Sequence, residues 1–352
     1  MAEREARHGD IVEVKSPAEI LATLDDDGTL DGLPFMPEML QYCGRRLTVE
    51  KRAEKLCDMI YPLASRKLPD AVLLEDLRCD GSGHDGCQAE CRIFWKEAWL
   101  RPIRAGRPSS IGASSDPIVS VVELLARNAK RTTEVDGQVV TDYTCQATEM
   151  HRATQPLGRW DPRPIVREYT SGNVRLGTFL RVAARALIWE PLRVLGLRPK
   201  VPLRGSGNAT KPAPLGLQPG DTVQVRLKEE IAETLNAQGF NRGLWFDEEM
   251  LPHCGGRYRV RQRIRRFIDE HTGKLVELKT DAVTLEGVVC SGERSPVRWF
   301  CPRGSYPFWR ESWLRPMDQG EPETPDRVTE APDDLEQPVD AVFHHPVPPD
   351  RG

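Results

Sequence analysis

Alternating apolar and polar side chains open two stretches that lie far apart in the chain. Residues 11–14 read Ile-Val-Glu-Val and residues 222–225 read Thr-Val-Gln-Val, which is the period-two pattern of a half-buried strand. Residues 257–264 alternate in the same way. The segment 94–100, Phe-Trp-Lys-Glu-Ala-Trp-Leu, places both of its tryptophans on one face of a strand. These patterns predict a fold that is mainly β.

Three stretches predict helices instead. The segment 16–25 begins Ser-Pro-Ala-Glu, a capping box with proline at the first helical position. A second helix is predicted to begin at Asp116, and a hairpin at Asp136-Gly137 follows it. A third spans residues 173–189, and we expect it to pack on the strands, with binding at a membrane surface as the alternative. Its apolar face consists of Leu176, Phe179, Leu180, Ala183 and Leu187, and Arg175, Arg181 and Arg185 lie elsewhere.

The chain also repeats itself. The segment "GDIVEV" at 9–14 returns as "GDTVQV" at 220–225, an offset of 211 residues that continues without a gap for most of a domain. After a three-residue insertion the offset becomes 214, and "FWKEAWLRP" at 94–102 matches "FWRESWLRP" at 308–316. A match of this length and order indicates an internal duplication. The two predicted copies are residues 8–102 and 219–316.

Each copy is a domain of fewer than a hundred residues that opens with Gly-Asp-x-Val-x-Val. In this respect it resembles the SH3-like small β-barrels, and the resemblance implies a fold without implying an activity. Residues 103–215 are predicted to form a mixed helix and hairpin segment that ends in a linker. The expected fold class is therefore α+β, mainly β, with two duplicated SH3-like barrel domains flanking this middle segment.

Charge is distributed unevenly along the chain. The formal net charge is −4, but residues 318–352 contain ten acidic and two basic residues, so the tail carries −8 and the rest of the chain +4. The tail is rich in proline and poor in aromatic residues, which predicts disorder. We find no apolar run long enough for a membrane span and no apolar signal core. We therefore expect a cytoplasmic protein, whose nine cysteines serve as thiols or ligands rather than disulfides.

The stretch 77–91, "LRCDGSGHDGCQAEC", gathers three cysteines and a histidine in one glycine-rich loop. Thiolate sulfur and imidazole nitrogen are the ligands of structural zinc sites, and glycines let the backbone wrap around an ion. A mixed set of nitrogen and sulfur ligands favours zinc over an iron–sulfur cluster. The predicted ligands are Cys79, His84, Cys87 and Cys91, with Cys43 as an alternative member. Cys43, Cys79 and Cys87 each have a cysteine at the equivalent position of the second copy.

The second copy offers a further candidate metal site, although it lacks the equivalents of His84 and Cys91. Its candidate ligands are Cys254, Cys290, Cys301 and His253. Two alternatives remain open for the cysteines of both copies. They can be small hydrophobic packing residues, as we expect for Cys57, which isoleucine replaces in the second copy. A catalytic thiolate is the other alternative, although the sequence carries no recognisable nucleophile signature.

Five arginines alternate along residues 257–265, and they would share one face of a strand able to meet phosphates. They are Arg257, Arg259, Arg261, Arg263 and Arg265. The favoured interpretation is a solvated strand face or a docking surface for the acidic tail, and nucleic-acid binding is the alternative. The paired tryptophans Trp95/Trp99 and Trp309/Trp313 are expected in the cores.

The tripeptide Cys-Gln-Ala occurs at 87–89 and again at 145–147. Cys145 and His151 would complete a site across domains, but we expect so short a match to be coincidental. The leading hypothesis is a cytoplasmic, non-enzymatic binding or scaffold protein with a protein partner and a zinc site in the first copy. A metal- or thiol-dependent enzyme or redox protein that uses the 79–91 loop comes second, and a nucleic-acid binder third. Peripheral membrane contact is not expected.

Overall fold

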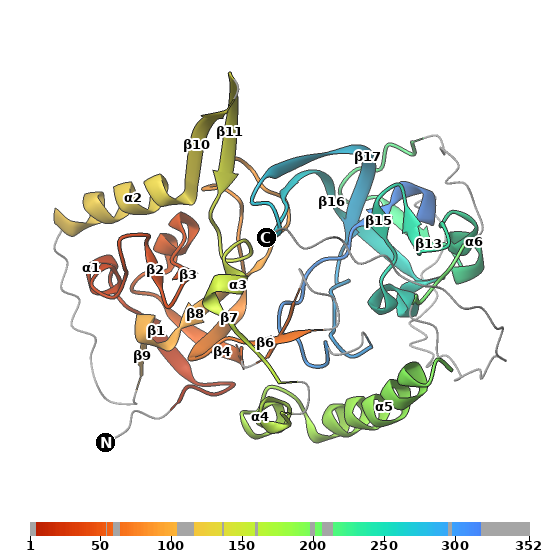
Figure 1. Cartoon of the computed structure of the whole chain (residues 1–352), viewed down its shortest axis with the longest axis horizontal. Coiled ribbons are helices and arrows are strands. Elements are labelled where there is room, and N and C mark those ends of the chain that lie inside the picture. The colour runs from red at the N-terminus through yellow and green to blue at the C-terminus, as the bar shows by residue number, and fades with distance from the viewer. Residues whose placement is uncertain are drawn as a thin grey trace, which may run out of the picture.

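The structure of this protein, a computed structural model, describes residues 5–53, 55–58, 64–103, 116–135, 137–158, 161–197, 201–205, 214–294 and 298–317. Within these residues the fold is mixed α+β with more strand than helix, as the patterns along the sequence predict. Figure 1 shows two β-rich halves side by side. The predicted disordered tail, 318–352, lies outside the described residues.

The first half is built on a five-stranded antiparallel sheet in the order β8-β7-β4-β1-β9. The strands are β1 (Ile11–Val14), β4 (Arg46–Arg52), β7 (Ala71–Arg78), β8 (Arg92–Lys96) and β9 (Leu100–Pro102). The first predicted helix is α1 (Pro17–Leu21), where Ser16 and Glu19 form the expected capping box. The short elements are β2 (Thr29–Leu30), β3 (Leu33–Pro34), β5 (Leu56–Cys57), β6 (Ser65–Lys67) and the 3-10 helices η1 (Pro37–Tyr42) and η2 (Glu97–Trp99).

The second half has a sheet of equivalent order, β18-β17-β16-β13-β19. Its elements are β13 (Thr222–Val225), α6 (Lys228–Glu233), β14 (Phe240–Asn241), β15 (Leu244–Trp245), η3 (Glu248–His253), β16 (Arg257–Ile268), β17 (Leu275–Leu285), β18 (Trp309–Arg310), η4 (Glu311–Trp313) and β19 (Leu314–Pro316). Even the register agrees, because Ile11 pairs with Thr48 and Thr222 with Arg259, both at the offset of 211 found in the sequence. We call the two halves the first and the second repeat; that they are SH3-like barrels stays a prediction.

The tryptophans form the centre of each core. Trp95 and Trp99 are fully buried, and Phe35 meets the ring of Trp99 edge to face at 5.2 Å between centroids. In the second repeat Phe246 meets Trp313 in the same way at 5.4 Å. Edge-to-face pairs add about 0.5–1.5 kcal/mol to the burial of the rings. The complete burial of these tryptophans confirms the prediction that they are core residues.

The glutamates beside these tryptophans are structural in both repeats. Glu97 forms an ion pair with Arg52 and accepts a hydrogen bond from the Ala6 backbone N–H at 2.9 Å. At the equivalent positions Glu311 lies 3.5 Å from Arg263 and accepts from the Leu217 N–H at 3.0 Å. Each carboxylate thus ties the segment that leads into the repeat to the sheet.

The middle of the chain forms a protruding hairpin and several helices (Figure 1). The elements are α2 (Asp116–Ala129), β10 (Lys130–Val135), β11 (Gln138–Tyr143), α3 (Met150–Ala153), β12 (Gln155–Pro156), α4 (Arg163–Thr170) and α5 (Leu176–Val194). The predicted hairpin forms, since Val135 pairs with Gln138, and Asp136 of the predicted turn lies outside the described residues. β12 pairs with β6, so the middle segment adds a strand to the first repeat.

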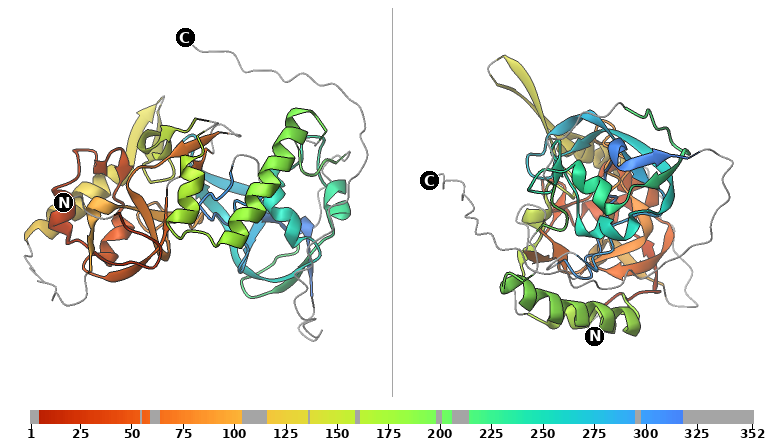
Figure 2. Two further views of the ribbon diagram at one scale, coloured as in Figure 1. Left: turned by 90° about the horizontal axis from the view of Figure 1, so that it is seen from below. Right: turned by 90° about the vertical axis from the view of Figure 1, so that its right-hand side faces the viewer.

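Helices α4 and α5 lie along both repeats (Figure 2). After α4, Asn173 hydrogen-bonds the backbone of Arg52 in the first repeat, and in α5 the ring of Phe179 stacks on Phe300 of the second at 5.7 Å. The apolar face of α5 packs on the repeats only in part, because Leu180 is 56% and Leu187 77% exposed. Among the described residues, no helix combines the length and apolar composition that crossing a bilayer requires.

The contact between the repeats is pseudo-symmetric. The sulfur of Cys87 accepts a hydrogen bond from the backbone N–H of Ile268 at 3.3 Å. The equivalent sulfur, Cys301, accepts from the backbone N–H of Cys57 at 3.2 Å. Position 57 is equivalent to 268 and position 87 to 301, so the two repeats meet as the halves of a two-fold dimer do.

Gln88 strengthens this contact at a bulge in β16, between Ile264 and Arg266. Its side-chain Oε1 accepts from the backbone N–H groups of Arg265 at 2.7 Å and Arg266 at 3.1 Å. Its Nε2 donates to the carbonyl of Arg263 at 3.1 Å. One glutamine of the first repeat therefore hydrogen-bonds three backbone groups of the second repeat at this bulge.

Replacement of Gln88 by alanine is expected to lower the free energy of unfolding by about 1–2 kcal/mol, because the N–H groups at the bulge lose their acceptor and must bind water. Hydrogen exchange at the amides of Arg265 and Arg266 should become faster, and this can be measured by mass spectrometry. The control is Gln224→Ala, since Gln224 bonds the Gly255 carbonyl within its own repeat. Unchanged exchange at both amides in Gln88→Ala would contradict the role given to Gln88.

Candidate metal centre

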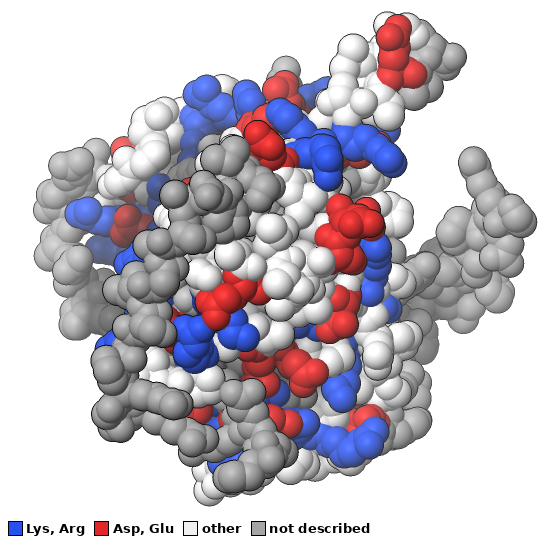
Figure 3. All heavy atoms as spheres, turned by 90° about the vertical axis from the view of Figure 1, so that its left-hand side faces the viewer, with Lys and Arg blue, Asp and Glu red and all other residues white. Residues whose placement is uncertain are grey.

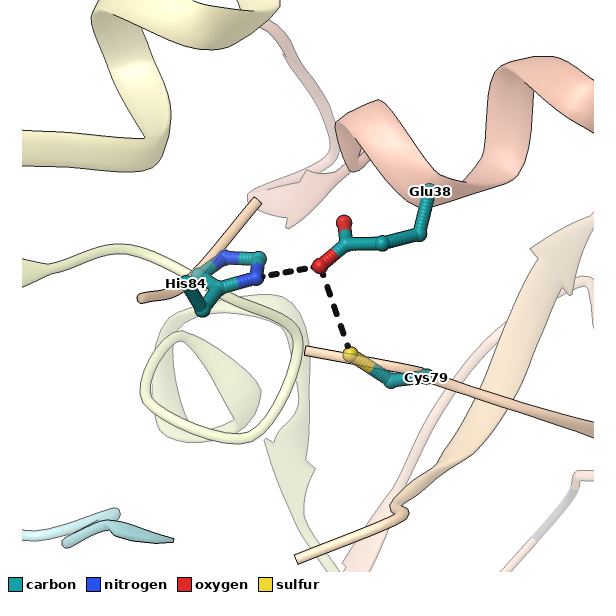
Figure 4. Close-up of side chains that lie close together, drawn as sticks. All are labelled: Glu38, Cys79 and His84. Carbon is teal, nitrogen blue, oxygen red and sulfur yellow. Dashed lines mark hydrogen bonds and ion pairs between the residues drawn. The ribbon is translucent and has the colours of Figure 1, made fainter. Parts of the chain in front are cut away.

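Three side chains from different parts of the first repeat converge beneath its glycine-rich loop (Figure 4). Glu38 comes from η1, which begins at Pro37, a residue suited to the first helical position. Cys79 follows the last residue of β7, and His84 lies in the loop itself. The side-chain ligand atoms of these residues all lie within 4.8 Å of one another.

The carboxylate of Glu38 lies at the centre of the group. Its Oε1 is 2.6 Å from His84 Nδ1 and 3.5 Å from Cys79 Sγ, and it accepts a third hydrogen bond from the Gly83 N–H at 3.1 Å. Both His84 and Glu38 are almost fully buried. The other carboxylate oxygen, Oε2, is buried without a hydrogen-bond partner among the described residues. A buried anionic oxygen without a donor is costly, and a bound cation would satisfy it.

His84 is held at both ring nitrogens. Nδ1 faces Glu38, and Nε2 lies 3.1 Å from the backbone carbonyl of Thr144. Because carboxylate and carbonyl oxygens only accept, the metal-free arrangement requires both nitrogens to carry protons. With a metal on Nδ1, the Nε2–H donor to a carbonyl is the usual second hydrogen bond of a histidine ligand. The same geometry therefore suits a buried ion pair or a metal site.

The pKa values of the two groups have moved toward the charged forms. Burial alone would lower the pKa of His84, but its hydrogen bond and charge interaction with Glu38 raise it above the ordinary value. Burial alone would raise the pKa of Glu38, but the hydrogen bond and charge of His84 hold it below the ordinary value. A cation at this position, whether imidazolium or metal, stabilises the carboxylate.

The loop is closed so tightly that one of its positions has room only for glycine. At Gly81 the backbone has φ +72°, and an added Cβ would lie 2.1 Å from the carbonyl oxygen of Cys87. The Cys79 N–H donates to the Cys91 carbonyl at 2.9 Å and closes the base of the loop. This folding brings the cysteines of the loop around one space.

That space is a cavity of about 30 Å3, which can hold a single ion or water molecule. The side chains of His84 and four cysteines line it. The four are Cys79, Cys87, Cys91 and Cys145. Burial raises the pKa of the Cys145 thiol to about 11 and those of Cys79 and Cys91 still higher, so that without a cation these groups remain protonated.

The predicted ligands of the first repeat are thus only partly brought together. Cys79 and His84 belong to the close group, and Cys87 and Cys91 lie at the cavity but outside that group. Cys43 packs against the first hydrophobic core, and burial raises its pKa to about 11. Among the described residues, Cys43 does not line the cavity and does not belong to the close group.

The four candidate ligands of the second repeat do not form a close group among the described residues. His253 Nδ1 pairs with the Tyr258 hydroxyl at 2.7 Å, and Cys301 lies beside Cys57. The physical reason is visible at the position equivalent to His84, which is Arg298. Its guanidinium forms an ion pair with Asp247 at 2.7 Å, so the second repeat has a built-in cation instead of a nitrogen ligand.

Two residues of the site were not among the predicted ligands. Glu38 gave no signal, because an isolated glutamate in a short 3-10 helix has no ligand spacing. Cys145 belongs to the repeated Cys-Gln-Ala and lines the same cavity as Cys87. That the tripeptide match is coincidental stays a prediction. His151 lies elsewhere, 3.0 Å from Arg66, and does not join the site.

The five alternating arginines of residues 257–265 are less available to a ligand than the sequence pattern suggests. β16 has irregularities between Val260 and Gln262 and again between Ile264 and Arg266, which interrupt its period. Arg261 pairs with Glu90 at 2.8 Å, and Arg263 pairs with Asp281 and Glu311. Figure 3 shows a different face, the side where the first repeat lies, and there acidic and basic side chains are interspersed.

Comparison with known proteins gave no match to a family model, to a curated protein or to a solved structure. The chemistry of the site therefore rests on its geometry.

Proposed function

We propose that this chain is a non-enzymatic binding and scaffold protein whose first repeat holds a structural zinc ion. The single observation that carries the proposal is the buried Glu38 Oε2, which lacks a donor in a group with Cys79 and His84. Zinc takes carboxylate, thiolate and imidazole ligands together, and the cysteines at the cavity offer a fourth. The metal would supply the cation that this group of side chains favours.

The position of the site gives the ion a structural task. The loop that carries Cys79 and His84 also carries Cys87 and Gln88, which bind β16 of the second repeat. A metal that orders the loop would therefore also fix one repeat against the other. Since ligand atoms of a structural site converge only in the folded chain, binding energy becomes folding energy.

Two properties of the site favour this function over a thiol-dependent enzyme. A nucleophilic cysteine needs a lowered pKa, whereas burial raises the pKa values of Cys79, Cys91 and Cys145. The cavity of about 30 Å3 is also far smaller than the pockets of some 300–1,000 Å3 that hold substrates.

The proposed partner is another protein. Helix α5 exposes apolar side chains along one stripe, and a contiguous apolar surface is typical of an interaction site. The exposed members are Leu176, Leu180, Leu187 and Ile188. We propose the cytoplasm as the location because none of the nine cysteines forms a disulfide.

The test of the metal site is elemental analysis, together with an absorption spectrum, of protein purified without added metal. We expect stoichiometric zinc and no visible absorption. A brown protein with an iron–sulfur spectrum would replace zinc by a cluster and favour a redox function. Protein that contains no metal and does not take up zinc on titration would overturn the proposal.

A further inference from the structure

Two buried thiols meet where the repeats join, away from the proposed metal. Cys57 lies in β5 of the first repeat, and Cys301 lies between β17 and β18 of the second. Their sulfur atoms are 3.2 Å apart, and the two residues are 6% and 4% exposed. At the pseudo-symmetric contact the partner of Cys87 is Ile268, so of these two equivalent contacts only this one brings two sulfurs together.

The charges around this pair favour a thiolate on Cys301. Arg303 and Lys55 are buried beside it, and Lys55 donates to the carbonyl of Trp299 at 2.9 Å. Burial alone would raise the pKa of Cys301, but hydrogen bonds from the Cys57 thiol and from backbone N–H groups, with the charge of Arg303, lower it to about 6. The same hydrogen bond and burial raise the pKa of Cys57, which therefore remains the thiol that donates.

We propose that Cys57 and Cys301 are an oxidation site, at which hydrogen peroxide forms a disulfide that locks the two repeats together. The Cys301 sulfur attacks one oxygen of the peroxide, the O–O bond breaks, and a sulfenic acid and one water form. The Cys57 sulfur then attacks the sulfenic sulfur and displaces the second water. The two thiols lose two protons and two electrons in total, and one peroxide is reduced to two waters.

The small space beside Cys57 is expected to favour a small oxidant. A cavity of about 10 Å3 lies beside Cys57, and Arg303 and Glu270 also line it. This is room for about one water-sized molecule. Hydrogen peroxide, with two oxygen atoms, is only slightly larger than water, whereas oxidised glutathione is many times larger, so we expect peroxide to reach the pair far faster.

The experiment treats the reduced full-length chain with hydrogen peroxide and measures its intact mass and its tryptic peptides without reduction. We expect a mass loss of two hydrogens and one cross-link, between the peptides that contain Cys57 and Cys301. Because the bond joins distant parts of the chain, the melting temperature should rise by roughly 10 °C. Addition of a reductant should reverse both changes.

Cys57→Ile is the informative variant, because isoleucine occupies the equivalent position 268 and the variant is expected to fold. It should form no such cross-link and show no rise in melting temperature. Cys254→Ser, at a cysteine that packs against the second core, should behave as the wild type. Peroxide treatment that leaves both Cys57 and Cys301 reduced, or that joins either one to another cysteine, would overturn the proposal. If oxidised glutathione forms the cross-link as fast as hydrogen peroxide does, the proposal that peroxide is the oxidant is overturned.

Discussion

Loading with zinc is expected to raise the free energy of unfolding by about 4 kcal/mol when free metal exceeds its dissociation constant a thousandfold. For a chain of this size that corresponds to a rise in melting temperature of roughly 5 °C. The physical reason is that the ligands from η1, from the end of β7 and from the loop meet only in the folded protein. A chelator should remove the gain, and differential scanning calorimetry with and without the chelator measures it.

The matched control for this prediction lies in the second repeat. Cys79→Ser should bind little zinc and should melt at the same temperature with and without chelator. Cys290→Ser changes the equivalent cysteine, which does not belong to the close group, and should keep the response of the wild type. If the two variants respond alike to the chelator, the site at Cys79 is not the one that stabilises the fold.

Substitution of Glu38 by glutamine is expected to lower the free energy of unfolding of the metal-free protein by about 3 kcal/mol. Loss of one partner from a buried ion pair costs about 3–5 kcal/mol. We expect the lower end, because neutral His84 can still donate from Nδ1 to the glutamine oxygen. Its deprotonated Nε2 would then face the Thr144 carbonyl without a hydrogen bond. Urea denaturation of apo protein measures the difference.

The control is Glu249→Gln at the equivalent position. Glu249 accepts from the Ser291 hydroxyl and the Arg294 N–H, and His84 is replaced by Arg298 in that repeat. We expect a smaller loss there. An equal loss of free energy of unfolding in both variants would show that the Glu38–His84 ion pair adds no stability of its own.

The pH dependence of stability is expected to differ between the metal-free Glu38–His84 ion pair and the zinc-bound site. Because the pKa of His84 is raised, its contribution is complete below the ordinary value of 6.5 and is lost as pH rises through the higher folded pKa. Because the pKa of Glu38 is lowered, its contribution is complete above 4.5 and is lost as pH falls through the lower folded pKa. The pair should thus stabilise metal-free protein most between pH 4.5 and 6.5. Stabilisation by zinc should instead grow with pH, since the metal displaces protons from its ligands.

Local patterns determined much of this fold. The capping box at Ser16 and the turn after Val135 depend on neighbours in sequence, and both form as predicted. The internal match at an offset of 211 anticipated the equivalent strand order and register of the two sheets, since similar apolar patterns bury similar faces. The burial of Trp95 and Trp313 follows from the same periodicity.

Which polar groups meet was decided only by the tertiary structure. Glu38 reaches His84 across 46 positions, and Cys301 reaches Cys57 across 244, because strand pairing brings their elements together and no local pattern records this. The bulges of β16 interrupt the alternation of side chains between the two faces of the strand, which the sequence alone shows as continuous. The sequence by itself therefore determined the strands, the duplication and the cysteine-rich loop. Long-range packing alone decided that a glutamate joins that loop and that two cysteines face each other between the repeats.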